Sequence, residues 1–182
     1  MQSLTRHLSR LAHGLCFASL SALALYPSSV ENANPEPYEF TVVNKLNLND
    51  DQADVAKGVE RIMKNHGFSD SLIMAAIVNA YAESGLDPNV VGSAGELGIF
   101  QLNPKGLGKT MKDHEMKDIR KSTVRIIGAM RKSKRIMKLE KRKASAAEHV
   151  VAFCTEIERP KNMNRRAKQR VKTLRSIMKK NS

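Results

Sequence analysis

The sequence predicts a mainly α-helical domain with a small β-hairpin, and three observations lead to this fold class. Apolar side chains recur three and four residues apart over 50–65, an almost uniformly apolar stretch fills 71–82, and helical spacing returns after residue 117. These are the patterns of amphipathic and buried helices. At 182 residues the chain has room for one hydrophobic core of ordinary size, so we expect one domain.

The N-terminal segment 1–30 has the order of an export signal. Met1–Arg10 is basic and contains no acid, Leu11–Leu25 is mostly apolar, and Tyr26–Ser29 breaks the apolar run. The apolar run is short for a membrane span. We therefore predict a signal peptide or a signal anchor over 1–30 and export to the periplasm or cell envelope, with an organelle presequence or a disordered tail as the alternatives.

Residues 31–49 contain proline breaks and no helical period, which is typical of a linker. The folded domain is predicted over 50–180. Its first helix is predicted over 50–65, where the apolar side chains share one face and Asn49 or Asp50 can cap the start. The domain therefore begins with an amphipathic helix.

A second helix is predicted over Ser71–Ala82, with Ser69 or Asp70 as its N-cap. The helix is apolar almost all round, so it is expected to run through the middle of the core. Glu83 follows at its C-terminal end, and Gly85 can adopt the left-handed conformation that stops a helix.

The stretch 90–102 carries glycines three residues apart, at Gly92, Gly95 and Gly98. Its last part has a strand-like composition. We predict a compact, glycine-shaped loop that contains a small hairpin at 95–103.

Three further helices are predicted in the C-terminal part, because helix-start residues precede apolar positions at helical spacing. They are expected from Asp118 through Met137, from Ala146 to Ile157 behind a Ser145–Glu148 capping box, and from Asn162 or Asn164 through Ile177.

Positive charge is concentrated in the C-terminal part of the chain. Residues 1–104 carry 6 basic and 11 acidic side chains, a balance of −5, whereas residues 105–182 carry 25 basic and 7 acidic ones, a balance of +18. Such a surface attracts polyanions, which include nucleic acid, anionic lipid and acidic cell-wall polymers. Only one aromatic residue, Phe153, lies in the basic part. Because nucleic-acid modules usually add stacking aromatics or zinc-finger spacing, we do not expect nucleic acid as the partner.

The cysteines and histidines do not form a recognisable framework. Cys16 and Cys154 are far apart, and the five histidines are scattered along the chain. We expect no structural disulfide, no metal site and no cofactor.

Glu83 is the candidate catalytic residue. Cleavage of a glycosidic bond needs a carboxyl group that is still protonated near neutral pH, and an apolar setting raises a carboxyl pKa. The end of a buried helix offers such a setting, and the negative end of the helix dipole acts in the same direction. The alternative is that Glu83 is simply the first polar residue after a core helix.

Two linked motifs bear on this choice. Glu83-Ser84-Gly85 is followed at short separation by Gly95–Pro104, which has the form G-x-x-G-x-x-Q-x-x-P. In these motifs the sequence resembles the soluble lytic transglycosylase and goose-type lysozyme superfamily. Further on, Phe153 followed by Glu158-Arg159-Pro160 resembles the bacteriophage tail lysozymes. Glu158 and Arg159 are predicted either to border the cleft or to form only a local ion pair.

The resemblance implies a lysozyme-like fold and assigns a role to each matching residue. Glu83 would be the general acid and base, and the Ser84 hydroxyl would orient it. Gln101 would line the sugar cleft, Gly98 would let the backbone approach the substrate, and Phe100 would pack beneath the loop.

The sequence departs from the superfamily pattern in two places. Residues 153–156 lack the tyrosine that transglycosylases of this type usually place there, and Glu96 occupies a position that is usually small. An inverting hydrolase needs a second carboxylate to activate water, whereas a transglycosylase can work with one glutamate. Glu96 is therefore predicted to face the cleft, either as that second carboxylate or as a solvated loop residue.

The resemblance implies an enzyme that cleaves the β-1,4 bond between N-acetylmuramic acid and N-acetylglucosamine, as a lytic transglycosylase or a muramidase. The expected partners are peptidoglycan glycan strands, anionic envelope polymers or lipids at the basic part, and virion or secretion machinery. The alternatives are a non-catalytic wall-binding or virion module, an endopeptidase on the same scaffold, and a basic nucleic-acid-binding protein.

Overall fold

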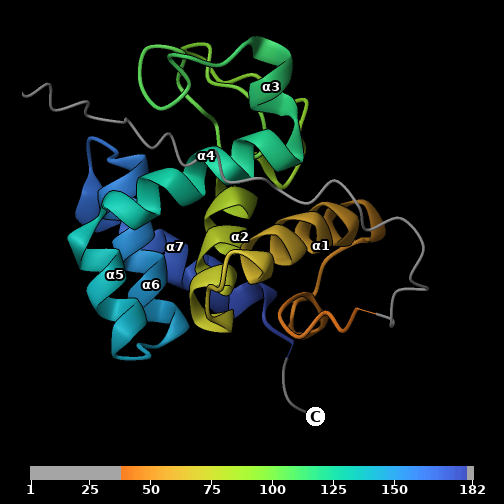
Figure 1. The fold of residues 1–182 in the computed structure, drawn as a ribbon, viewed down its shortest axis with the longest axis vertical. Helices are drawn as coiled ribbons and strands as arrows, with labels where there is room; N and C mark the ends of the chain where they lie inside the picture. Colours follow the sequence, from red (N-terminus) through yellow and green to blue (C-terminus); the bar gives the residue numbers. More distant parts are fainter. Residues whose placement is uncertain (1–37, 180–182) are drawn as a thin grey trace, which may run out of the picture. The chain divides into compact units, whose positions relative to one another are not determined.

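The computed structural model of the protein describes residues 38–179, and over these residues the chain is mainly α-helical, as predicted (Figure 1). The predicted signal segment 1–30 lies outside the described residues. Helix α2 lies at the centre and packs against α1, α6 and α7. The elements are η1 (Val43–Lys45), α1 (Asp50–Asn65), α2 (Asp70–Ser84), α3 (Asp113–Lys117), α4 (Ile119–Lys132), α5 (Lys134–Lys141), α6 (Ala146–Phe153), the π-helical turn η2 (Cys154–Glu158) and α7 (Met163–Ile177).

Helix α1 has the predicted bounds because its sequence supplies both the cap and the apolar face. The Asn49 side chain accepts a hydrogen bond from the Gln52 backbone N–H, and the Gln52 side chain accepts one from the Asn49 N–H. This reciprocal pair satisfies two backbone donors at the start of the helix. The buried face of α1, which includes Val59 and Met63, packs against α2 and α4.

Helix α2 is the buried core helix that the sequence predicts, and it extends as far as Ser84. Every residue of Leu72–Ala80 is buried. Gly85 ends the helix with a left-handed φ of 66°, which costs a glycine little. The helix includes Glu83 in its last turn.

The predicted long helix after Asp118 is divided into α4 and α5 at Ser133. Ser133 is extended, with φ −81° and ψ 108°. Its hydroxyl accepts a hydrogen bond from the Ile136 N–H at 3.3 Å and donates one to the Glu156 carboxylate at 3.4 Å. The side chain thus caps α5 and ties it to η2. A serine that can bond to the backbone competes with a continuous helix in this way.

The predicted helix Ala146–Ile157 begins where expected, behind the Ser145–Glu148 capping box. After Phe153 it widens into the π-helical turn η2. The turn ends at Arg159, which has a left-handed φ of 49°. Helix α7 then begins at Met163, one residue after the predicted cap Asn162.

The stretch 38–49 belongs to the folded domain, contrary to the linker predicted over 31–49. Val42 is fully buried, and the backbone N–H groups of Val42 and Val43 donate to the buried Glu60 carboxylate at 3.1 and 2.8 Å. Next to this turn, the chain near Leu46 pairs with the end of α7. The Asn47 N–H donates to the Ile177 carbonyl at 2.6 Å, and the Lys179 N–H donates to the Lys45 carbonyl at 2.8 Å.

The predicted hairpin at 95–103 is reduced to isolated bridges. Leu97 pairs with Val91 and with Leu102, and no extended ladder forms. The physical reason is the backbone of this loop, because Gly95, Gly98 and Gln101 all adopt positive φ. Each such residue turns the chain out of the extended conformation that a strand requires. Over 38–179, no helix combines the length and the apolar character needed to cross a bilayer.

Gly98→Ala is expected to destabilise the fold by about 3 kcal/mol. Gly98 has φ 76°, and a Cβ atom at this position would lie 2.3 Å from the Met116 carbonyl oxygen. Gly128→Ala is the matched control. Gly128 is helical and has open space around the added methyl group, so this change should stabilise the protein by about 0.5–1 kcal/mol. Urea unfolding of both variants measures the difference, and equal stabilities would contradict the packing described.

Candidate active site

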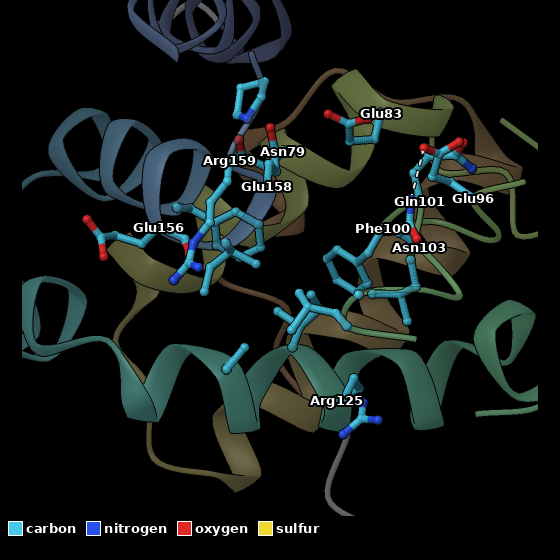
Figure 2. A pocket seen from close by; sticks show the side chains of 18 of the residues that line it. Asn79, Glu83, Glu96, Phe100, Gln101, Asn103, Arg125, Glu156, Glu158 and Arg159 are labelled. Atoms are coloured by element: carbon cyan, nitrogen blue, oxygen red, sulfur yellow. Dashed lines mark hydrogen bonds between the residues drawn. The ribbon is translucent and has the colours of Figure 1, made fainter. Parts of the chain in front are cut away.

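A large open cleft runs between α4 on one side and α2, η2 and the loop 92–107 on the other, with a volume of about 1390 Å³. Figure 2 shows α4 along one wall and Glu83 on the opposite wall. Glu96, Gln101 and Asn103 lie at one end, and Glu156 and Arg159 lie at the other. The cleft is long enough to accept an extended ligand, with Glu83 between its ends.

Glu83 lines this cleft, and its side chain is 29% exposed. Helix α2 holds it there, because Glu83 is the second-last residue of the helix and Gly85 turns the chain away. The Ser84 hydroxyl, to which the resemblance gave the role of orienting Glu83, forms its hydrogen bonds with two backbone carbonyls. It donates to the Ala80 carbonyl at 3.1 Å and to the Ile99 carbonyl at 3.0 Å. Ser84 therefore fastens the cleft loop to the end of α2.

A buried arginine from α7 joins Glu83 to a second glutamate. Arg170 is 4% exposed and forms an ion pair with Glu83 through Nη2. The same guanidinium donates to Glu158 Oε2 from Nη2 at 3.0 Å and from Nε at 3.3 Å, and its Nη1 donates to the Ala82 carbonyl at 3.3 Å. Arg170 therefore brings together three segments that are far apart in sequence. They are the end of α2, the end of η2 and the middle of α7.

Glu158, rather than Glu83, has the enclosed setting that the sequence predicts for the acid. Its side chain is 10% exposed, against 29% for Glu83. Burial, opposed by the charge of Arg170 and assisted by that of Glu83, raises the pKa of Glu158 from 4.5 to about 7. Burial likewise raises the pKa of the neighbouring Cys154 thiol to about 12. The Glu158 carboxyl group, whose pKa is near neutral pH, thus contacts the same arginine as Glu83.

Gln101 and Glu96 line the cleft, and both are tied into the loop. The Gln101 amide donates to the carbonyls of Gly98 at 2.9 Å and Val90 at 3.2 Å. Glu96 Oε2 accepts from the Ala94 N–H at 3.1 Å, and Oε1 accepts from the Asn103 amide at 3.5 Å. Because both Glu96 oxygens are engaged within the loop, the contacts favour a bracing role over a role as a base.

The glycines and Phe100 shape this wall. Phe100 is 7% exposed and its ring lies 6.4 Å from that of Phe153, so it packs in the core beneath the loop. Gly98 approaches the Met116 backbone rather than the cleft. Gly92 lines the cleft, and a Cβ atom there would meet Gln101 Oε1 at 2.5 Å and Glu96 Oε2 at 2.6 Å. Of the three spaced glycines, Gly92 is the one that gives these side chains room.

The comparisons with known proteins identify the family of the chain. A family model described as phage tail lysozyme matches residues 54–180. The chain belongs to the phage tail lysozyme family. No curated protein and no solved structure matches the chain. Membership makes the protein lysozyme-like, of a peptidoglycan-degrading class, and confirms the predicted resemblance.

Two polar residues of this phage tail lysozyme-family site were not predicted from the sequence. Arg170 occupies the apolar stripe of α7 between Ala167 and Leu174, and an arginine on such a stripe is the pattern that could have identified it. Asn79 is fully buried in α2, one turn before Glu83, and lines the cleft. Its only clue in the sequence is that it is polar within an apolar helix.

Proposed function

We propose that the protein cleaves the β-1,4 bond between N-acetylmuramic acid and N-acetylglucosamine in peptidoglycan, with Glu83 as the general acid and base. The observation that carries this proposal is the position of Glu83. It is a part-exposed carboxylate on the wall of a long cleft, tied by a buried arginine to a second carboxyl group. Membership of the phage tail lysozyme family supports the substrate class.

The reaction needs one proton at Glu83. The Glu83 carboxyl group donates this proton to the glycosidic oxygen, the bond from that oxygen to the muramic C1 breaks, and positive charge develops on the sugar ring. The Glu83 carboxylate then accepts a proton from water or from the muramic 6-hydroxyl as that oxygen bonds to C1. The carboxyl group is thereby restored, so no cofactor is consumed.

Arg170 and Glu158 are positioning residues in this proposal. One guanidinium contacts both carboxyl groups and therefore fixes how they lie relative to each other. Through this contact Arg170 holds the Glu83 side chain at the cleft wall. Asn79 Oδ1, a buried oxygen of α2, accepts no hydrogen bond from the residues that the structure describes.

Glu158→Gln is expected to flatten the dependence of stability on pH. Folding raises the pKa of Glu158 to about 7, so the native state holds this proton more tightly than the unfolded chain does. Between pH 4.5 and about 7 the unfolded state binds fewer protons, and stability falls as pH rises, by on the order of 3 kcal/mol in all. Glutamine removes the titration. Denaturant unfolding of both proteins at pH 5 and pH 7.5 measures the change, and an unaltered difference between the two pH values would contradict the burial of Glu158.

The chemistry is tested by mass spectrometry of the fragments released from purified peptidoglycan. The proposal expects disaccharide-based fragments, with reducing ends if water attacks C1 and 1,6-anhydro ends if the 6-hydroxyl attacks. Cut peptide stems on intact glycan would identify an endopeptidase instead. Binding to murein sacculi without release of fragments would identify a non-catalytic wall-binding module.

The place of action proposed for this activity is the bacterial envelope, reached from a virion or through export to the periplasm. The C-terminal part supplies 25 basic side chains against 7 acidic ones, which suits attraction to the anionic polymers and lipids of that compartment. Attraction of this kind weakens as ionic strength rises.

A further inference from the structure

The two ends of the cleft carry different charge. At one end lie the polar side chains of the glycine-shaped loop, among them Glu96, Gln101 and Asn103. Six cations line the cleft. Five of them come from the segments near the other end, which we call the basic end: Lys132, Lys134, Arg135, Arg159 and Arg166. The sixth, Arg125, lies earlier on α4, and its guanidinium donates to the Thr110 hydroxyl. Glu83 lies between the two ends, as Figure 2 shows. A ligand that extends along the cleft past Glu83 therefore reaches the basic end.

The basic end is assembled from four segments, which are the end of α4, the start of α5, the turn after η2 and the first part of α7. One face of α4 lines the cleft from Val124 to Lys132, a distance of about 12 Å at 1.5 Å per residue. Where α4 ends, Ser133 and Arg135 contact η2 through Glu156 and Thr155, at 3.4 and 3.0 Å. Arg159 and Arg166, from the turn after η2 and from the first part of α7, complete this end.

Positive charge at the basic end is mostly not neutralised by the protein. Arg135 is 3.7 Å from the Glu156 carboxylate. Within residues 38–179, the other four cations have no carboxylate within 4 Å. Glu158, which also lines the cleft, is paired with Arg170 instead. The five cations therefore outnumber the carboxylates beside them. A bound anion would therefore gain charge-assisted hydrogen bonds here without displacing a partner from most of these side chains.

Arg159 is held in this position at a conformational cost. Its φ of 49° is left-handed, a conformation that an arginine seldom adopts. Its Nε donates to the Glu156 carbonyl at 2.9 Å, and the terminal guanidinium nitrogens remain for a ligand. Figure 2 shows the side chain lying along the cleft wall near Glu156.

We propose that the basic end binds the carboxylates of the peptide stem on the glycan strand, so that the preferred substrate is stem-bearing peptidoglycan rather than bare glycan. This inference rests on the proposed function. The sugar hydroxyls and acetamido groups of the strand are uncharged, whereas a muramic residue carries a lactyl group and its attached peptide, where the carboxylates are found. A strand with its scissile bond at Glu83 places a stem-bearing muramic unit along the cleft, and five of the six cations that line the cleft belong to the basic end.

The test compares two soluble glycan fragments of equal length, one with peptide stems and one from which an amidase has removed them. The wild-type protein should cleave the stem-bearing fragment with a kcat/KM about tenfold higher, as expected when several exposed ion pairs each contribute a few-fold. The ratio of kcat/KM for the stem-bearing fragment to kcat/KM for the bare fragment should fall close to one in the double variant Lys134→Glu/Arg166→Glu. Both positions lie in the first turn or so of a helix, where an acidic side chain is compatible with the fold.

The matched control is Lys138→Glu/Lys168→Glu. It makes the same change of charge on the same two helices, at exposed positions that do not line the cleft, and it should keep the wild-type ratio. A second measurement needs no variant, because the wild-type ratio should fall towards one when salt is raised from 50 to about 500 mM.

Each other outcome is decisive. A wild-type ratio near one, or a ratio that charge reversal leaves unchanged, overturns the stem site while leaving glycan cleavage established. Failure of the wild-type protein to cleave either fragment overturns the proposed function itself. If charge reversal abolishes binding of a purified phosphate-bearing wall polymer but leaves the ratio unchanged, the cations bind phosphate and the stem assignment is wrong.

Discussion

Glu83→Gln is expected to lower the rate of fragment release from purified peptidoglycan on the order of 10³-fold, because glutamine cannot donate a proton to the glycosidic oxygen. The substitution keeps the size and shape of the side chain at the end of α2. One of its amide atoms can still accept a hydrogen bond from Arg170, so circular dichroism and unfolding should show an intact domain. Binding to sacculi should persist, since the cleft walls are unchanged.

Glu115→Gln is the control for this experiment. Glu115 lies in α3, pairs with Lys121 at 2.9 Å and does not line the cleft, so this variant should keep the wild-type rate. Glu96→Gln provides a comparison within the cleft, and we expect less than about a tenfold loss of rate because Glu96 braces the loop rather than transferring a proton. Full activity of Glu83→Gln would show that the reacting carboxyl group is another residue, with Glu158 as the next candidate.

Arg170→Met is expected to cost about 3–5 kcal/mol of stability at pH 7.5. Methionine fills much of the volume but leaves Glu83 and Glu158 facing each other without the cation that both contact. For a domain of this size the loss corresponds to a fall in Tm of roughly 10 °C. The loss should be smaller at pH 5, where protonation relieves the repulsion between the two carboxyl groups.

Arg175→Met is the matched control, because it also removes an arginine from α7 but leaves the ion pairs of Arg170 in place. Arg175 is exposed on the same helix, so its replacement should change stability by no more than about 0.5 kcal/mol. Combining Arg170→Met with Glu158→Gln should restore part of the lost stability, since the double variant no longer buries a lone carboxylate. Additive losses in the double variant would contradict the direct coupling of these two residues.

Local sequence patterns predicted the helices well. Asn49 and Gln52 form the cap of α1, and Ser145 and Glu148 form that of α6, in agreement with side-chain chemistry within four residues of each helix start. The position of Glu83 at the end of the core helix follows from the apolar run before it and from Gly85 after it. The predicted family resemblance rested on motifs in two stretches, 83–104 and 153–160, and the match over 54–180 confirms it.

Features that depend on distant contacts were not predictable. Arg170 forms an ion pair with Glu83, 87 residues earlier in the chain. Helical periodicity places Arg170 on an apolar face, but it does not predict which residue Arg170 contacts. The turn around Val42 becomes ordered because its N–H groups bond to Glu60, 17 and 18 residues later. The expected hairpin failed for a local reason, the positive φ values at Gly98 and Gln101, which composition alone does not reveal.

The pairing of the chain near Leu46 with the end of α7 determines how this domain can be joined to other domains. Residues 45–47 and 177–179 are hydrogen bonded to each other, so the end of the domain lies beside a segment only a few residues from its beginning. A domain with this arrangement can be inserted into a surface loop of a host protein without stretching the host. It can also be circularly permuted with a short connector.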